Sequence, residues 1–161
     1  MMAEVVTRHV DSYLFRWEGG KLRFLLLKRH RGKFYGHLWQ GVAGRIERGE
    51  TAVETVMREV REETGLDPAR ILVVDHVSSF YESHKDRIQL VPVFGVEVHS
   101  SLVRLSGEHT EFRWAGFETA RELLSWKHQK EAISVLNEML SSDDERLKWS
   151  EVKTEGRLRD R

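Results

Sequence analysis

A helix with clearly marked ends is the feature that most constrains how this chain folds. Thr51 and Glu54 stand three positions apart, a spacing at which each side chain satisfies the other's free backbone N–H at a helix N-terminus. Gly65 suits the left-handed conformation that follows a last helical turn, and Pro68 disfavours continuation. The sequence therefore predicts one helix over 51–64, with both of its ends fixed.

Two neighbouring faces of this helix differ in chemistry. Residues three and four positions apart share a helix face, so an apolar stripe is formed by Val53, Val56, Met57, Val60 and Thr64. Glu59, Glu62 and Glu63 fall on an adjacent face. We expect the stripe to pack on a sheet, which leaves the three carboxylates at the mouth of the core.

The carboxylates on this face predict a bound cation. Carboxylates within one turn repel one another, and a divalent cation such as Mg2+ relieves the repulsion by taking oxygen ligands. The alternative is a solvated face, because the Arg-Glu-x-x-Glu-Glu pattern is common on exposed helices. However, Gly44, Gly49 and Glu50 give the helix a looped entry, and Gly65-Leu66 fixes its exit. A solvated face needs neither, so we favour the metal site.

Apolar segments on both sides of the helix predict a sheet. The segments expected to be strands are 5–17, 22–28, 71–81, 88–98 and 112–114. A glycine turn at 18–21 joins the first two strands. A helical region is expected over about 118–140, broken near Trp126. Strands that flank a helix and are followed by further helices favour a mixed α/β sandwich.

Composition sets further bounds. The 161 residues are most simply one domain, expected over 1–140, with a charge-dense tail over 141–161 that we expect to be mobile or loosely docked. The chain carries 26 basic and 26 acidic residues, so no overall attraction to a nucleic acid polymer or a membrane is expected. The absence of cysteine excludes a disulfide scaffold, a thiolate metal site and a thiol nucleophile.

The N-terminal sequence shows no secretory signal pattern. No apolar run approaches the roughly 20 residues that a membrane-spanning helix needs. We therefore expect a cytoplasmic protein without a membrane partner. The histidines show no metal-ligand spacing, so no histidine zinc site is expected.

The segment GRIERGETAVETVMREVREETGL, from Gly44 to Leu66, resembles the signature of the Nudix hydrolases, GX5EX7REUXEEXGU with U apolar, at every position. The resemblance implies the Nudix α/β/α sandwich with a mixed sheet. It also implies a hydrolase that cleaves a diphosphate linked to another moiety. In that reaction water attacks one phosphorus while bound cations neutralise the charge on the leaving phosphate.

The resemblance also implies roles for individual residues. Glu59 and Glu63 match the principal metal ligands, and Glu62 matches a ligand that assists directly or through water. Arg58 matches an arginine that pairs with a glutamate of this signature segment, which is called the Nudix box. In this chain that glutamate is expected to be Glu50. Backbone carbonyls at Ala43 or Gly44 complete the coordination in relatives. The expected cofactor is Mg2+, with Mn2+ as a possible substitute.

In the Nudix family, a further acidic residue outside the box often acts as an additional metal ligand or as a general base. Glu108 and Glu111 are the candidates, in the segment GEHTEFRW that begins at Gly107. This segment is similar to one in bacterial dihydroneopterin triphosphate pyrophosphatases, which also act on deoxynucleoside triphosphates. The similarity aligns Glu108 with the acid of that group, while the choice between the two acids stays open.

The remaining candidates would contact the substrate. Arg29 is expected to bind a phosphate, with an ordinary surface arginine as the alternative. Trp39 and Gln40 would pair a stacking ring with an amide that reads a base or pterin edge, unless Trp39 belongs to the core. Ala43 lies at the site entrance. Lys127 would reach a phosphate from the last helix, or simply begin that helix in solvent.

The expected function is Mg2+-dependent hydrolysis of a nucleoside or dihydroneopterin triphosphate to a monophosphate and pyrophosphate. The first alternative is a hydrolase of a dinucleoside polyphosphate, a nucleotide sugar or ADP-ribose. The second is a non-catalytic module that senses a nucleotide, which typically lacks box glutamates that are all present here. The expected partner is a small diphosphate-containing molecule, bound by a monomer or homodimer.

Overall fold

The helix predicted from the sequence is present in the computed structural model, which describes residues 2–141 and 144–153. Helix α1 covers Ala52–Thr64, and the Thr51 hydroxyl accepts a hydrogen bond from the Glu54 backbone N–H at 3.2 Å. Gly65 closes the helix in the left-handed conformation, with φ 71°. Both predicted ends of the helix are therefore confirmed.

A mixed sheet crosses the middle of the molecule. Its strands are β1 (Glu4–Val6), β2 (His9–Glu18), β3 (Lys21–Arg29), β4 (Trp39–Gln40), β5 (Val42–Arg45), β6 (Arg70–Glu82), β7 (Arg87–Glu97) and β8 (His109–Ala115). The central order is β1-β7-β2-β3-β4, with β5 paired to β2, β6 to β7 and β8 to β3. Strand β7 runs parallel to β1 and β2, whereas the other pairs are antiparallel.

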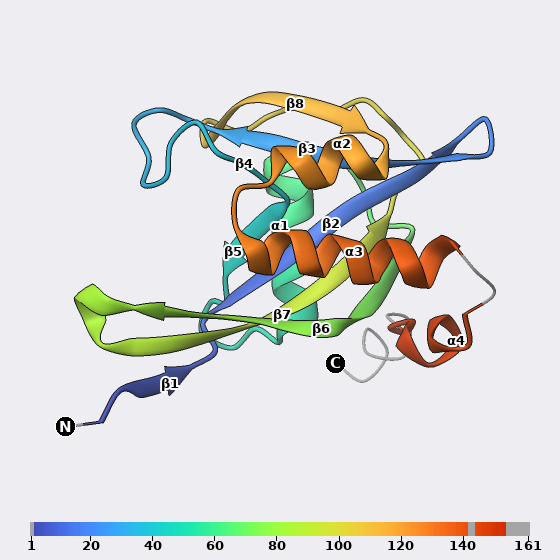
Figure 1. Cartoon of the computed structure of the whole chain (residues 1–161). Helices are drawn as coiled ribbons and strands as arrows, with labels where there is room; N and C mark the ends of the chain where they lie inside the picture. The colour runs from blue at the N-terminus through green and yellow to red at the C-terminus, as the bar shows by residue number, and fades with distance from the viewer. Residues whose placement is uncertain (1, 142–143, 154–161) are drawn as a thin grey trace.

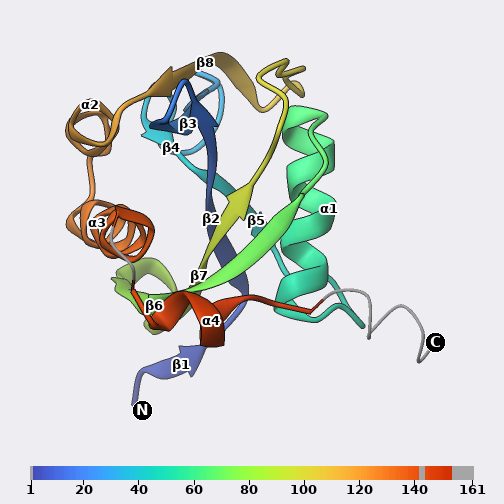
Figure 2. The ribbon, with the colours of Figure 1, turned by 90° about the vertical axis from the view of Figure 1, so that its right-hand side faces the viewer.

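Helices cover both faces of this sheet. Figure 2 shows α1 on one side and α2 (Phe117–Leu123) with α3 (Lys127–Ser141) on the other. The α1 side buries a cluster that includes Val56 and Val60 of the helix, and the α3 side buries a second cluster that includes Ile133 and Leu136. Neighbouring residues on a strand point into different layers. The predicted α/β/α sandwich is confirmed.

Some elements differ from the expectation. The strand expected over 5–17 is divided into β1 and β2, because residues 4–6 pair only with β7 whereas β2 pairs with β3, β5 and β7. Strands β4 and β5 were not predicted, since two and four residues are too few for a periodic pattern to be recognised. The expected helical region is broken at 124–126, as predicted near Trp126.

Part of the charged C-terminal segment packs on the domain. Helix α4 (Arg146–Ser150) places Leu147 against the α3-side cluster, and the Val152 N–H donates to the Ile71 carbonyl at 2.8 Å. Residues 142–143 and 154–161, on which much of the predicted tail falls, lie outside the described residues. Among the helices of the described ranges, none has the length and apolar character needed to cross a membrane. Figure 1 shows α4 beside β6.

Candidate metal and substrate site

Gly44 brings strand β5 against helix α1. Gly44 lies opposite Val10 in the β2–β5 ladder. A Cβ atom at residue 44 would overlap the Glu59 side chain, with the Glu59 carboxylate oxygen only 2.6 Å away. Only glycine permits this close approach. The backbone at the entrance of the predicted site therefore lies directly against one of its predicted metal ligands.

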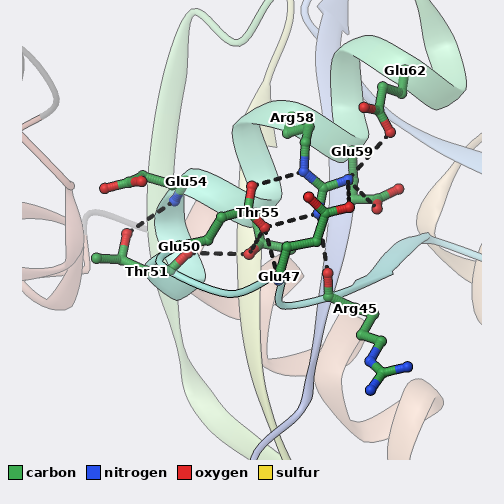
Figure 3. A network of polar contacts seen from close by, with 9 residues as sticks. All are labelled: Arg45, Glu47, Glu50, Thr51, Glu54, Thr55, Arg58, Glu59 and Glu62. Atoms are coloured by element: carbon green, nitrogen blue, oxygen red, sulfur yellow. Dashed lines mark hydrogen bonds and ion pairs between the residues drawn. The ribbon is translucent and has the colours of Figure 1, made fainter.

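Arg58 ties together the carboxylates around the N-terminal part of α1 (Figure 3). Its Nε and Nη2 donate to the two oxygens of Glu50 at 2.7 and 2.9 Å. Its Nη1 donates to Glu59 at 2.7 Å and to Glu62 at 3.2 Å. The Arg45 carbonyl accepts a further bond from Nη2 at 3.1 Å. The pairing of Arg58 with Glu50 that the resemblance implied is present. The same guanidinium orients Glu59 through its Nη1 bond.

The same contacts settle the charge of Glu50. The hydrogen bond from Arg58 lowers the pKa of Glu50 to about 2, and bonds from the Glu47 backbone and the Thr55 hydroxyl act in the same direction. Glu50 is thus ionised at neutral pH. The bidentate contact between its carboxylate and the guanidinium is the stronger kind of ion pair, because two parallel bonds fix the geometry.

A second group of acids lies further along the helix and lacks such compensation. Glu63 is buried, with 3% of its surface exposed, and one of its carboxylate oxygens has no partner in the described part of the chain. Burial raises the pKa of Glu63 strongly, and the neighbouring carboxylates of Glu59 and Glu108 raise it further. This cluster of carboxyl oxygens, in which ionisation of Glu63 is unfavourable without a positive charge beside it, fits a hard divalent cation such as Mg2+. Glu59, Glu63 and Glu108 would hold it, with Glu62 at the rim.

Strand β8 separates the two candidates for the additional acid. Glu111 lies opposite Lys28, and its carboxylate is 3.2 Å from the Lys28 ammonium group. Lys28 also lies over the ring of Trp39, which packs against the α3-side cluster. Glu108, in contrast, offers a carboxylate oxygen within 4.8 Å of ligand atoms from Glu63 and His109. Glu108 therefore lies with the acids of α1, and Glu111 does not.

His109 belongs to this group although sequence analysis did not select it. Its side chain is buried, and its Nε2 lies 2.9 Å from the Nε2 of Gln40. Burial lowers the pKa of His109 to about 4, and the nearby charge of Arg29 adds to this, so the ring is neutral at pH 7. The only signal in the sequence was its position next to Glu108.

The predicted substrate residues fall in different places. Arg29 lies opposite His109 at a bulge in the β3–β8 ladder, close to the acids, and its Nε donates to the Phe34 carbonyl at 2.7 Å. Ala43 lies next to Gly44 in β5. Lys127 is almost fully exposed at the start of α3 and pairs with Glu131 at 3.6 Å. That ion pair involves none of the acids of α1.

Trp39 and Gln40 lie on opposite faces of the sheet. They are consecutive residues of β4, so their side chains point to opposite faces of the sheet. Trp39 packs against the α3-side cluster, as the core alternative proposed, whereas Gln40 contacts His109. The two side chains thus have different surroundings, and the expected roles of Trp39 and Gln40 in substrate binding stay predictions.

Exposed aromatic rings lie near the same end of β3. Phe34 and Tyr35 have ring centroids 4.1 Å apart, and Tyr35 meets Trp126 edge-on at 5.5 Å. All three side chains are at least 44% exposed. The loop that carries Phe34 and Tyr35 is attached to the acid cluster, because the His30 N–H donates to the Glu108 carbonyl at 2.8 Å. We call Phe34, Tyr35 and Trp126 the aromatic surface.

Comparison with known proteins places this arrangement in a family. The model of the NUDIX domain matches residues 7–137. An asymmetrical bis(5'-nucleosyl)-tetraphosphatase from Mus musculus is 28% identical over 130 residues, which are 79% of this chain and 86% of that protein. A NUDIX hydrolase structure from Listeria monocytogenes has a TM-score of 0.72 and 30% identity, covering 86% of this chain and 97% of that one.

The dihydroneopterin triphosphate pyrophosphohydrolase of E. coli has a TM-score of 0.65 and 23% identity, covering 82% of this chain and 99% of that one. At that identity the similarity shows a common fold and does not extend to the substrate. The family match, in contrast, spans the helices on both sheet faces, helix α1 with its carboxylates, and Glu108 just before β8. The chain thus belongs to the NUDIX domain family, and as a Nudix hydrolase it acts on phosphoric anhydride bonds.

Proposed function

We propose that this protein hydrolyses dinucleoside polyphosphates asymmetrically in the presence of Mg2+, with Mn2+ as a possible substitute. Water adds across one phosphoric anhydride bond, so that a dinucleoside tetraphosphate would give a nucleoside triphosphate and a nucleoside monophosphate. The observation that carries the proposal is the buried carboxyl group of Glu63 beside the exposed Glu108, since neither acid has an ion pair among the described residues.

Each residue of the site has a proposed part in this reaction. Glu59, Glu63 and Glu108 hold the divalent ion, and Glu62 assists at the exposed rim. The ion, when bound, neutralises charge on the phosphate chain. Arg58 fixes the direction of Glu59, and the Gly44 backbone closes the entrance beside it. Glu108 serves as an additional ligand or as the general base.

Two observations support the choice of substrate. The tetraphosphatase relative from mouse is covered over 86% of its length, so the similarity is not limited to the box. The aromatic surface offers exposed rings on which a nucleobase can stack, close to the strand end that carries Arg29. A substrate with two nucleosides has a second base, which can stack on the aromatic surface outside the acid cluster.

The second candidate is the pyrophosphohydrolase reaction on a nucleoside or dihydroneopterin triphosphate, which the sequence analysis placed first. The segment GEHTEFRW around Glu108 favours it. A hydrolase of ADP-ribose or a nucleotide sugar has no such observation in its favour. Any preference would be set by groups outside the acid cluster, because the cluster recognises the diphosphate alone.

A substrate panel tests the proposal. The protein is incubated with Mg2+, or with EDTA, and with diadenosine tetraphosphate, dATP, dihydroneopterin triphosphate or ADP-ribose. We expect Mg2+-dependent formation of ATP and AMP from the tetraphosphate, with the highest kcat/KM of the panel. A higher value for either triphosphate would select the second candidate. Tight binding of one compound without turnover of any would identify a sensing module instead.

A further inference from the structure

A glutamine and a histidine form a polar pair beneath α1 that the proposed reaction does not use. Gln40 and Phe112 pair with the same residue, Leu27, from opposite edges of β3, so the strands β4 and β8 flank it. The Gln40 amide reaches across this strand to His109, with the two Nε2 atoms 2.9 Å apart. His109 is 4% exposed and lies beside the oxygens of Glu63 and Glu108.

The chemistry of the amide determines where the ring proton lies. An amide NH2 group donates hydrogen bonds and does not accept them. The Nε2 atom of His109 must therefore accept from Gln40, and a ring whose Nε2 accepts carries its proton on Nδ1. Within the described ranges, Nδ1 is buried and has no hydrogen-bond partner. A buried N–H without an acceptor is unfavourable, which indicates that the acceptor comes from a ligand.

The surroundings restrict the kind of acceptor. A protonated Nδ1 has no free lone pair, so it cannot bind a cation. It can donate to an anionic oxygen, and the charge of Arg29 on the facing strand favours an anion at the same place. The carboxylates of Glu63 and Glu108 next to it are the proposed holders of the divalent ion. A phosphate chain bound to that ion would bring oxygens into this region.

We propose that Gln40 is a positioning residue that holds His109 as the Nδ1–H tautomer, and that His109 donates a hydrogen bond to a phosphate oxygen of the bound substrate. This proposal rests on the proposed function, since it needs a phosphate chain in the site. It assigns His109 to substrate binding and excludes it from the metal ligands. In the competing arrangement, Gln40 presents its oxygen, Nε2 carries the proton and Nδ1 binds the metal.

The tautomer can be measured without any substrate. Long-range 1H–15N correlation spectra of the metal-free protein distinguish a protonated from an unprotonated ring nitrogen, and a His109→Asn spectrum identifies the signals of this residue by their loss. We expect a protonated Nδ1 in His109. His30 is an internal reference, because its Nδ1 accepts from the Gly32 N–H at 3.0 Å and its neutral ring must carry the opposite tautomer. A protonated Nε2 in His109 would overturn the proposal, whatever the outcome of the substrate panel.

The same spectra separate a donor from a metal ligand. Mg2+ is added first, and methylenediphosphonate, a diphosphate analogue that is not hydrolysed, is added second. We expect the His109 Nδ1–H to remain after both additions, with a shift from Mg2+ bound nearby and a further downfield shift of this proton when the diphosphonate is added. Loss of this proton on addition of Mg2+ alone would make His109 a ligand and refute the donor role.

Two substitutions at His109 test the roles of its two ring nitrogens separately. The amide of asparagine lies near the position of Nδ1, whereas that of glutamine reaches the position of Nε2. We expect His109→Gln to lower kcat/KM about 10- to 100-fold, the loss typical of a hydrogen bond to a charged group, and His109→Asn to retain most of the activity. Equal losses in the two variants would contradict a donor at Nδ1.

Substitution of Gln40 tests the positioning role. Gln40→Glu replaces the donor by an acceptor, so the ring proton should move to Nε2 and kcat/KM should fall about 10-fold or more. The matched control is Gln129→Glu at the exposed start of α3, where the side-chain oxygen accepts from Trp126 N–H and a carboxylate can do the same. The control should change neither the His109 signals nor the rate. A Gln40→Glu protein with an unchanged tautomer would overturn the positioning role.

Discussion

The two ends of the carboxylate array on α1 differ in how their negative charge is balanced. At the end defined by Arg58, Glu50 before the helix and Glu59 and Glu62 on it all receive hydrogen bonds from the guanidinium. Glu63, one turn beyond Glu59, is buried beside further acids and receives no such bond from a cationic side chain that the structure describes. At the first end, the carboxylates are balanced by a side chain of the protein itself. We propose that the second is completed by a cation from solution, and the substitutions below separate the two.

The largest effect is expected at the uncompensated end. Glu63→Gln keeps the shape of the side chain and removes its charge, so we expect kcat to fall by at least about 100-fold. The metal-free variant should nevertheless be as stable as the parent or more stable. Addition of Mg2+ should raise the Tm of the parent and leave that of the variant nearly unchanged. Near-full activity in this variant would show that Glu63 is not a ligand.

A pair of substitutions, one just before β8 and one within it, tests which acid belongs to the same end. Glu108→Gln should reduce kcat by about 10- to 100-fold, because it removes a carboxylate from the cluster. Glu111→Gln should leave kcat within about twofold, since its partner is Lys28 on the other face of the sheet. Steady-state kinetics at saturating Mg2+ measure both. The reverse ranking would move the additional acid to Glu111.

The compensated end should respond chiefly in stability. Arg58→Met leaves Glu50 and Glu59 without their shared partner, and we expect a loss of about 2 kcal/mol in the free energy of unfolding. Arg61→Met on the same helix is the control, because Arg61 contacts only the highly exposed Asp67 among the ion pairs found. That change should stay within about 0.5 kcal/mol. Urea unfolding compares them, and equal losses would mean that the Arg58 network adds no stability.

The smallest effect is a contrast in pH dependence. The pKa of Glu50 is lowered from 4.5 to about 2, so its stabilising contribution is complete above pH 4.5 and is lost as the pH falls toward 2. The pKa of Glu63 is raised from 4.5, so the folded protein retains a proton that the unfolded chain releases, and stability is lost as the pH rises above 4.5.

Thermal unfolding of the metal-free protein between pH 3 and pH 8 measures this contrast. Relative to the parent, Glu50→Gln should become more destabilising as the pH rises from 3 to about 5. Glu63→Gln should become more stabilising from about pH 5 to pH 8. Curves that run parallel to the parent for both variants would mean that neither carboxyl group is coupled to folding.

What could be predicted from the sequence follows from how local each signal is. The ends of α1 were predictable because the Thr51 cap and the Gly65 conformation depend on residues within a few positions. The pairing of Arg58 with Glu50 follows from the family pattern. The long strands β3, β6 and β7 carry enough apolar residues to be recognised, and each was located to within one residue at either end.

The parts that were missed depend on distant contacts. His109 lies near the acids of α1 because β8 pairs with β3. No residue pattern in the sequence predicts that strand pairing. The side chains of Trp39 and Gln40 point to opposite faces because both residues belong to β4. This strand of two residues forms by pairing with β3. The choice between Glu108 and Glu111 likewise needed the register of β8.

Strand β4 has a consequence for how this enzyme can change over time. Two adjacent codons serve two independent purposes: Trp39 fills the layer beneath α3, and Gln40 contacts the histidine beneath α1. The two side chains contact different layers of the protein, so we expect the side-chain effects of substitution at one position to depend little on the other. Selection for stability at position 39 and for altered chemistry at position 40 can therefore proceed side by side, although the residues are chain neighbours.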